Sequence, residues 1–594
     1  MIYMKWENIS EKSLFISAGE FDYYGGWALD TQFIQNMGSS YLLAHGLGNP
    51  VENAVKKINI KEPGKYKIWA YTKDWVARWK KGVSPGLFKI KIDGWTSETL
   101  GNKNASWAWQ EAGICEITKI TGEESELSLV DMTGFEGRCA AVLLCADLDF
   151  IPPDAKEEFT EFRNKLCGYD KLAPENAGSF DIIITGGGIS GMAAAISAAK
   201  NGLKTALIQD RYVLGGNNSS EVRVWLGGEV GFEPFPKIGD IVKSFEPAKH
   251  FHYGKDNIGE IYEDDKRIAM LEEYKNIKLF FGYTIISADV KNNKINGVKF
   301  IDVKTHKSQV AYADYFADCT GDATLGFLAD ADYEITTNGH MGMTNVWYVE
   351  DTGEETEFPK CPWAIDLSDP SCNFPGRNAK DYEGAKQLGG WYWESGMEHD
   401  PIIFAEEARD TNFRAMYGAF DALKNTDKGF YKTYKIGNAC YIGGKRESRR
   451  LLGDVILSKS EVLKNYKFED GCIPSTWQID VHYAKKEFYP SFHEGDAFLT
   501  NAYYDNFKHI PYFVPYRCLY SRNIENLFMA GRNVSVTHDA LGTVRVMRTG
   551  GMMGEVVGYA AALCRKYGVN PRNIYENHLG EFLEVLRRGQ ISSE

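Results

Sequence analysis

The sequence predicts a multidomain protein in which an N-terminal antiparallel β-sandwich precedes an α/β domain that carries an inserted α+β domain. Three observations support this prediction. The 594 residues are more than one ordinary hydrophobic core accommodates. Short apolar runs separated by turn signals continue up to about Pro153. A strand, a glycine-rich turn and a helix then follow from Asp181 onward, as in a nucleotide-binding fold.

The overall composition narrows the class of protein. A hydrophobic content of 44% and a charged content of 25% are typical of a soluble globular chain. The net charge of -14 argues against nucleic acid as a partner. We expect no membrane span and a cytoplasmic location, because no apolar run is long enough and the N-terminus lacks signal-peptide features.

The cysteines and histidines suggest neither disulfides nor a metal site. Eleven cysteines are scattered without a CxxC pair, which favours reduced, buried thiols and excludes a vicinal dithiol redox pair. No HExxH motif and no zinc-type Cys/His spacing occurs. We therefore expect no metal.

Residues 1–153 show period-two patterning, which predicts the antiparallel β-sandwich. In "GGWALD", "PGKYKIWAYT" and "LVDMTG" this region resembles carbohydrate-binding-like modules. Such modules stack flat aromatic rings on sugars, and Trp79, Trp107 or Trp109 would suit that role. The alternative, which we favour, is that the tryptophans fill the core or the interface with the next domain. Residues 154–179 then read as a helical linker bounded by prolines.

The nucleotide motif begins with the continuous apolar run "SFDIIIT", typical of a parallel strand covered on both faces. Gly186, Gly188 and Gly191 form GxGxxG, and an Ala-rich helix and the strand "KTALIQ" follow. The first glycine makes the turn, the second admits a pyrophosphate, and the third lets helix and strand pack. The acid expected to bind ribose is replaced by Gln209, with Asp210 next to it. The motif predicts a dinucleotide but does not choose which one.

Three further segments identify the cofactor. They are "DRYVLGGNNSSEVRVWLGG", "YFADCTGDATLGFLADADYE" and "ENLFMAGRNVSVTHDALGTVRVMRTGGMMGEVVGYAAALC", in this order. Together with "GGKRESRRLLGD" and "PYRCLY" they resemble FAD-dependent oxidoreductases of the glutathione-reductase-like class, with a fumarate-reductase-like layout. The resemblance runs from about Ser179 to the C-terminus. It implies a Rossmann-like FAD-binding domain in two parts, 180–334 and 515–594, with a substrate or cap domain, 335–514, inserted between them.

The resemblance also implies which residues hold FAD. The helix in "TGGMMGEVVGYAAAL" would direct its positive end at the pyrimidine edge of the flavin. No histidine occurs between Gly215 and Gly228, so we expect the FAD to be non-covalent. No second nucleotide motif is present, so NAD(P)H has no domain of its own. The predicted FAD-binding residues are Gly186, Gly188, Ile189, Ser190, Gly191, Gln209, Asp210, Arg211, Gly216, Asn217, Asn218, Ser219, Thr320, Gly321, Asp322, Gly531, Arg532, Asn533, Met552 and Met553.

Histidines are the first catalytic candidates, because removing a hydroxyl proton needs a base whose pKa is near the working pH. His538 lies beside the presumed flavin strand, with Asp539 as a possible orienting partner. His482 and His340 come next. For each of them, a structural or surface role is the alternative.

Arg449 is a further candidate. With Arg446 and Arg450 it would occupy one side of a helix and form an anion or flavin-phosphate clamp. The alternative is a helix ion-paired through Glu447 and Asp454. The aromatic side chains of the insertion suit a sugar or an aromatic ring, or else form a core. They are Trp347, Trp391, Tyr392 and Trp393.

The first functional hypothesis is hydride abstraction by FAD from a hydroxyl-bearing carbon of a carbohydrate or glycoside, a small-molecule substrate. A second is reduction of an activated C=C bond, with Arg545, Arg548 or Arg449 as proton donor or carboxylate clamp. A third is a ligand-binding protein with a vestigial nucleotide fold. The substrate, the electron acceptor and the oligomeric state, a homo-oligomer included, are left open by the sequence.

Overall fold

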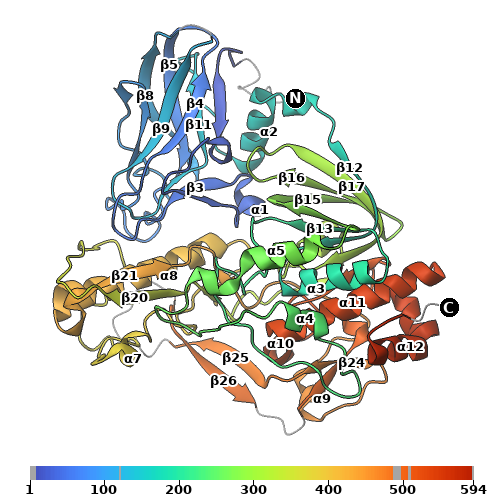
Figure 1. The fold of residues 1–594 in the computed structure, drawn as a ribbon. Helices are drawn as coiled ribbons and strands as arrows, with labels where there is room; N and C mark the ends of the chain where they lie inside the picture. Colours follow the sequence, from blue (N-terminus) through green and yellow to red (C-terminus); the bar gives the residue numbers. More distant parts are fainter. Residues whose placement is uncertain (1–8, 120–121, 486–496, 506–509, 592–594) are drawn as a thin grey trace.

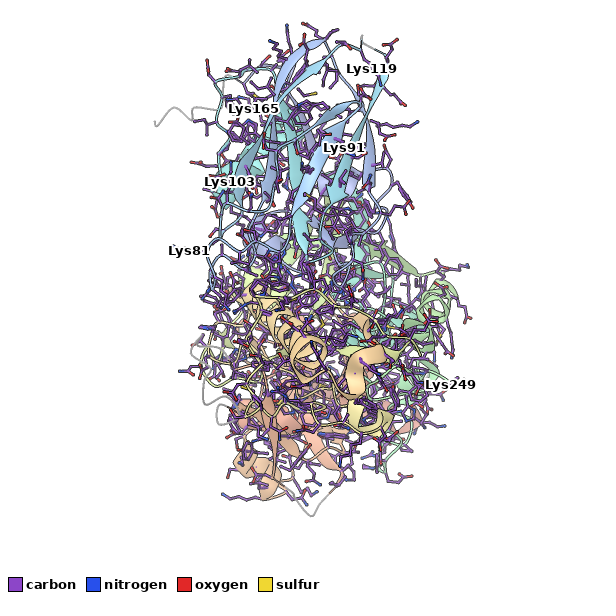
Figure 2. All side chains as sticks on the ribbon, turned by 90° about the vertical axis from the view of Figure 1, so that its left-hand side faces the viewer. Lys81, Lys91, Lys103, Lys119, Lys165 and Lys249 are labelled. Carbon is purple, nitrogen blue, oxygen red and sulfur yellow. The ribbon has the colours of Figure 1, made fainter. Side chains whose placement is uncertain are left out.

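The computed structural model shows N-terminal β-sheets standing on a larger α/β body (Figure 1). It describes residues 9–119, 122–485, 497–505 and 510–591. Viewed from the side, the N-terminal sheets form one end of the molecule, and exposed lysines such as Lys91 and Lys103 project from them (Figure 2). The predicted multidomain chain with an α/β nucleotide-binding part is confirmed.

Two four-stranded antiparallel sheets make up most of the N-terminal part. Apolar side chains of both sheets meet in one core, for example Ile68 and Val142 from one sheet and Ile90 and Leu129 from the other. A smaller three-stranded sheet adjoins them. In sheet order the strands are β1 (Leu14–Ser17), β11 (Ala141–Cys145), β5 (Gly64–Thr72) and β8 (Ala108–Ile117); β4 (Ala54–Asn59), β9 (Glu124–Asp131), β6 (Phe88–Ile92) and β7 (Trp95–Thr96); and β10 (Gly137–Cys139), β3 (Tyr41–Ala44) and β2 (Ala28–Asp30).

The segment predicted as a linker is a packed helix followed by the start of a strand. Helix α2 (Lys156–Leu166) buries Phe159 and Phe162 beside Trp109 and Tyr71 on the β1–β11–β5–β8 sheet. The rings of Phe159 and Tyr71 stack with centroids 4.2 Å apart. Strand β12 already begins at Glu175, within the predicted linker. The apolar side of α2 therefore holds this connection firmly against the N-terminal sheets.

The three tryptophans considered as sugar platforms have partners inside the protein. Trp109 is buried against α2. The indole nitrogen of Trp107 donates to a carboxylate oxygen of Glu406 at 3.1 Å. The guanidinium of Arg414 lies 4.7 Å from the ring centroid of Trp79. These contacts agree with the core and interface alternative.

The α/β body is built on a seven-stranded sheet whose parallel strands end at one edge. The parallel strands are near-continuous apolar runs, and Ile182, Ile183 and Ile184 are fully buried because helices and loops cover both faces. Strand β17 pairs with β16 along its first half and with β28 along its second half. The order is β14 (Ile277–Phe281), β13 (Thr205–Gln209), β12 (Glu175–Thr185), β17 (Ser308–Asp318), β16 (Lys294–Asp302) and β15 (Tyr283–Lys291), with β28 (Leu527–Met529) beside β17.

Helices α3 (Ile189–Lys200) and α11 (Met547–Tyr567) pack directly against each other, as Figure 1 shows. Glycines make this close approach possible. A Cβ atom on Gly554 would lie 2.0 Å from the Ser190 carbonyl oxygen, and one on Gly558 would lie 2.4 Å from the Ser197 Cβ. Residues of the FAD motif and of the C-terminal segment are thereby brought together. Within the described ranges, no helix is long and apolar enough to cross a membrane.

The region from 335 to 514 surrounds a second core that includes Trp347 and Trp393, so two of the four proposed substrate aromatics are core residues. The segment "KRESRR" is extended rather than helical, because its two ends pair with β19 and β18. The elements of this region are β18 (Tyr333–Glu334), β19 (Met343–Thr344), β20 (Trp347–Asp351), α7 (Tyr382–Ala385), α8 (Ala405–Asp421), β21 (Tyr434–Ala439), β22 (Gly444–Lys445), β23 (Arg450–Leu451), α9 (Lys459–Leu463), β24 (Gly471–Ser475), β25 (Ile479–Ala484), β26 (Thr500–Asp505) and β27 (Tyr512–Pro515).

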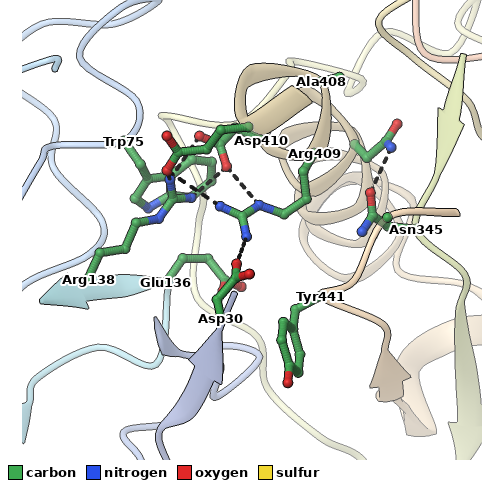
Figure 3. Close-up of polar contacts among 12 residues, drawn as sticks. Asp30, Trp75, Glu136, Arg138, Asn345, Ala408, Arg409, Asp410 and Tyr441 are labelled. Carbon is green, nitrogen blue, oxygen red and sulfur yellow. Dashed lines mark hydrogen bonds and ion pairs between the residues drawn. The ribbon is translucent and has the colours of Figure 1, made fainter. Parts of the chain in front are cut away.

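A buried charge cluster joins the N-terminal sheets to α8 (Figure 3). Arg138 pairs with Asp410 at 2.5 Å and with Glu406 at 2.7 Å. Arg409 of α8 pairs in turn with Asp30 of β2 at 2.8 Å. Removing either side of such a cluster would leave buried charges without partners, which costs several kcal/mol, on the order of 3–5 for one broken pair. The two parts of the chain are therefore held together as one unit.

Candidate FAD and active site

A cavity of about 250 Å³ lies along the edge where the parallel strands end. Ligands of open α/β sheets bind at this edge, because the loops there lie beyond the carboxyl ends of the strands. The lining includes the glycine turn after β12, the end of β13, the segment after β17, and the start of α11. A cofactor placed here would meet the glycine motif and the three segments that identified the cofactor.

The glycine turn has room for a phosphate at one position only. Gly186 has φ +92°, and a Cβ on it would lie 2.4 Å from the Cys319 carbonyl oxygen. A Cβ on Gly191 would lie 1.8 Å from the Gly186 carbonyl oxygen. At Gly188 the nearest atom to such a Cβ is the Gly216 Cα, 3.8 Å away. Gly186 and Gly191 are therefore required by the fold, whereas the space above Gly188 opens into the cavity beside the N-terminus of α3 and fits an anionic group.

The polar groups at the end of β13 have divided roles. The Gln209 side chain accepts from the Gly187 amide at 2.7 Å and donates to the Val213 carbonyl oxygen at 3.1 Å. Gln209 therefore secures the turn, although it also borders the cavity. Asp210 lies on the cavity too, where burial raises the pKa of its carboxyl group. Arg211 is paired with Glu221 at 2.8 Å.

Two cations line the cavity beside Asp322. The Asp322 carboxylate lies 2.6 Å from the Lys445 ammonium and 2.5 Å from the Arg532 guanidinium. Burial by itself would raise the pKa of Asp322, but the two cations outweigh it and hold the pKa well below its usual range. Lys445 was not among the predicted residues, although it lies in the recognised segment "GGKRESRRLLGD". This group fits an anionic cofactor, which cationic side chains bind strongly.

The twelve other predicted FAD residues divide between the cavity wall and its support. Seven line the cavity, namely Ile189, Ser190, Gly216, Asn217, Thr320, Gly321 and Gly531. Asn218 and Ser219 instead bond to the Val224 and Gly216 carbonyl oxygens and hold their own loop. Asn533 donates to the Asp318 carbonyl oxygen. Met552 and Met553 are fully buried in the second turn of α11, and the wall is formed instead by Met547 and Gly550.

Arg545 brings a charged cluster to the wall of the cavity. Its Nη2 atom lies 3.3 Å from an Asp480 carboxylate oxygen and 3.4 Å from the His482 Nε2. The Nε of Arg545 is buried and has no hydrogen-bond partner among the described residues. Burial lowers the pKa of this guanidinium. A partly unsatisfied guanidinium at a cavity wall is suited to bind an oxygen of a ligand.

Two of the predicted histidines form pairs with glutamates. The Nδ1 of His538 lies 2.8 Å from Glu447, and the Nδ1 of His482 lies 2.7 Å from Glu394. Glu447 rather than Asp539 therefore orients His538. A carboxylate at Nδ1 fixes the orientation and tautomer of the ring. In His538 this leaves Nε2 for chemistry, whereas the Nε2 of His482 already lies 3.3 Å from Asp480.

The electrostatics of the two glutamates keep them ionised. Burial would raise the pKa of Glu394, but Arg446 and His482 outweigh it and lower that pKa to about 2. Burial likewise opposes ionisation of Glu447, and contacts with His538 and Arg450 outweigh it and lower its pKa. Both carboxylates can therefore stabilise a positive charge on the imidazole that they hold.

The other two catalytic candidates lie elsewhere. His340 is 2% exposed, and its two ring nitrogens each lie 2.8 Å from a backbone carbonyl oxygen, of Met341 and His399. The Arg449 guanidinium lies 4.0 Å from the Phe327 ring centroid and donates to the Asp322 carbonyl oxygen. Like His538 and His482, neither residue lines the cavity. Because "KRESRR" is extended, its three arginines point to separate partners and do not form one clamp.

Aromatic side chains flank the charged cluster. The rings of Trp391 and His482 have centroids 5.1 Å apart. Trp477 donates from its indole nitrogen to Asp480 at 3.3 Å, and its ring lies 5.9 Å from that of Trp225. Trp391 was predicted as a substrate aromatic, whereas Trp225 and Trp477 stand in loops and were not predicted, although Trp225 lies in the segment "DRYVLGGNNSSEVRVWLGG". All three are partly exposed, so they form an aromatic border to the charged cluster.

Comparison with known proteins assigns the family. The family model described as FAD dependent oxidoreductase matches residues 181–583, which is more than half of the chain. The chain therefore belongs to this family and is an FAD-dependent oxidoreductase. FAD is its cofactor, and the hypothesis of a ligand-binding protein with a vestigial nucleotide fold is excluded. No curated protein matches the sequence.

Solved structures of flavoproteins resemble the chain at low identity. The open conformation of a flavocytochrome c3 fumarate reductase is 12% identical, with 68% of this chain and 81% of that chain covered and a TM-score of 0.32. The myxobacterial chondrochloren halogenase CndH is 11% identical, with 70% and 82% covered and a TM-score of 0.30. The flavin-dependent monooxygenase PieE is 14% identical, with 30% and 36% covered and a TM-score of 0.20, so the match spans about a third of that protein. At these TM-scores the assignment rests on the family model.

Proposed function

We propose that the chain oxidises a hydroxyl-bearing carbon of a ring-shaped substrate, such as a sugar or glycoside, with FAD as the hydride acceptor. The observation that carries this proposal is the His538–Glu447 pair at the start of α10 (His538–Val544), the helix whose C-cap is Arg545. Alcohol oxidation needs a base that takes the hydroxyl proton, and an oriented imidazole with a free Nε2 meets this need. The Nε2 of His538 has no partner among the described residues, and the side chain is 22% exposed.

Each residue of the site has a role in this proposal. His538 accepts the hydroxyl proton at Nε2, and Glu447 stabilises the resulting imidazolium. Arg545 binds the substrate oxygen through its unsatisfied edge, and His482 with Asp480 holds the guanidinium in place. Trp391 and Trp477 offer flat faces on which the apolar face of a sugar ring can stack.

The cofactor end of the cavity has corresponding roles. Bound FAD supplies a ring system that accepts a hydride. The open space at Gly188 and the N-terminus of α3 receive its pyrophosphate, with Lys445 and Arg532 nearby to balance the charge. Asp210 accepts the ribose hydroxyls in place of Gln209. The loop 215–228 contains no histidine, so the FAD is held non-covalently.

The division of the chain into domains follows the same proposal. Residues 1–153 form a β-sandwich and residues 180–334 and 515–594 form the FAD-binding domain. Residues 335–514 form the substrate domain, and 154–179 connect the first two parts. Supporting this division, the paired N-terminal sheets share one core, and most residues of a second core come from the inserted region.

The test is anaerobic reduction of the flavin. The holoprotein is mixed with a panel of sugars, polyols and glycosides, and flavin absorbance is followed. At least one compound should bleach the flavin of the unmodified protein. The His538→Ala variant should still bind FAD, but the same compound should reduce its flavin at least about 100-fold more slowly. His578→Ala, a change in α12 (Pro571–Arg588) where the histidine stacks on Tyr567, serves as the matched control. A flavin that stays oxidised with the entire panel would refute the proposal.

A second candidate is the reduction of an activated C=C bond. It is favoured by the contact of Arg545 with the Asp480 carboxylate, because such a pair can deliver a proton to a substrate carbon. In this case, reduced viologen would be oxidised when an unsaturated acid is added, and no sugar would bleach the flavin. Flavin reduction by a sugar and viologen oxidation by an unsaturated acid thus distinguish the two candidate functions.

A further inference from the structure

The N-terminal part of the chain contributes directly to the wall of the FAD cavity. Five residues between β2 and β3 line it together with the glycine turn, and helix α1 (Ile34–Met37) lies among them. Figure 1 places α1 where the N-terminal sheets meet the body of the molecule. The five residues are Thr31, Gln32, Ile34, Gln35 and Asn36.

This segment is bonded to other parts of the cavity wall. The Gln32 side chain accepts from the Gly443 amide at 2.8 Å and donates to the Tyr441 carbonyl oxygen at 3.1 Å. The Gln35 side chain donates to the Thr324 hydroxyl at 2.9 Å. Gly443 and Thr324 line the cavity themselves. The segment is thus connected to two separate stretches of the body across the cofactor space.

The last residue of the segment makes a third connection, and the buried charge cluster contacts the residues on either side of the segment. The Asn36 side chain donates to the Ile402 carbonyl oxygen at 2.7 Å. Asp30 directly precedes the segment and pairs with Arg409, as Figure 3 shows. Tyr41, which follows the segment, donates to the same Asp30 carboxylate at 2.6 Å. Both ends of the segment are therefore anchored by a cluster that is withdrawn from water.

We infer that residues Thr31–Asn36 are part of the FAD-binding site, so that the N-terminal sheets act as a cofactor-binding unit. Occupation of the cavity and the ordering of this segment are then thermodynamically linked, and each must favour the other by the same factor. The inference requires only that FAD occupies the cavity and does not depend on the substrate proposed above.

Substitution of the two glutamines tests this linkage in the full-length protein. Gln32→Ala combined with Gln35→Ala removes three hydrogen bonds that hold the segment over the cavity. We expect FAD to bind about tenfold more weakly and to dissociate faster on dilution. The reason is that FAD binding must then also order the segment, which lowers the net free energy of binding. Gln309→Ala is the matched control, because it removes a glutamine bond to Glu175 at the opposite end of β17.

Hydrogen exchange on the unmodified chain provides a second measurement that needs no variant. Amides of residues 31–37 should exchange more slowly when FAD is added to the apoprotein, whereas those of β6 on the far N-terminal sheet should change little. Equal FAD affinity in the double variant and the Gln309→Ala control would overturn the inference. Exchange of 31–37 that is unaffected by FAD would overturn it as well.

Discussion

Replacing Gly188 by alanine should weaken FAD binding with little change in the stability of the apoprotein. Gly188 has φ −68° and ψ 178°, which an alanine adopts without strain. The added Cβ would meet no protein atom closer than the Gly216 Cα at 3.8 Å. Alanine lowers the conformational entropy of the unfolded chain, which stabilises the folded state. Glycine is preferred over alanine at the N-cap of a helix, which acts in the opposite direction. The free energy of unfolding of the apoprotein should therefore change by less than about 1 kcal/mol.

The same methyl group would stand where a phosphate approaches the backbone. Losing one charge-assisted hydrogen bond costs about 1.5–3 kcal/mol, so FAD should bind about 10- to 150-fold more weakly. Thermal melting of the apoprotein and a fluorescence titration with FAD measure the two effects. Gly191→Ala should behave in the opposite way and destabilise the apoprotein, because its Cβ would lie 1.8 Å from the Gly186 carbonyl oxygen. A Gly188→Ala variant with wild-type FAD affinity would refute the assignment of this space to the cofactor.

Three further substitutions test other features. Burial raises the pKa of Glu555 to about 7 from 4.5, so the folded state keeps a proton that the unfolded chain loses. The free energy of unfolding should therefore fall by up to about 3 kcal/mol between pH 4.5 and 7 and should fall much less in Glu555→Gln, as measured by urea denaturation. Arg138→Met removes the cation closest to the Glu406 and Asp410 carboxylates, and it should lower the free energy of unfolding by about 3–5 kcal/mol. The exposed Lys91→Met is its control, and equal losses in both would contradict the role of the cluster. Glu447→Gln should preserve FAD binding but slow flavin reduction, because a neutral amide no longer stabilises the imidazolium that forms on His538. Anaerobic stopped-flow absorbance of the flavin measures this rate.

The parts of the site that are continuous in sequence could be predicted. Gly186, Gly188 and Gly191 act within one turn, so their spacing alone specifies the backbone geometry. The segment Thr320–Asp322 likewise follows a single strand and reaches the cavity directly. In these cases, residues close in sequence make the contacts, and a local pattern contains the necessary information.

Other parts depend on contacts between distant segments. The His482 and Glu394 side chains are 88 positions apart, and only the tertiary fold brings them together. Met552 and Met553 belong to the expected helix, but α11 begins at Met547 without a side-chain cap that could mark its start. Because the helix begins at Met547, the side chains of Met552 and Met553 lie on its buried side and point into the core. The arginine spacing in "KRESRR" suggested a helix, whereas strand pairing at both ends keeps the segment extended.

The cavity wall spans nearly the whole chain, and this has a consequence for biosynthesis. Its first contribution is Thr31 and its last is Gly550. At synthesis rates of about 5–20 residues per second, roughly 25–100 seconds separate the two on the ribosome. The N-terminal sheets, completed by β11, are available long before β28 and α11 exist. The complete FAD cavity therefore cannot form until the C-terminal segments have been synthesised. We expect FAD to bind only after nearly the whole chain has folded.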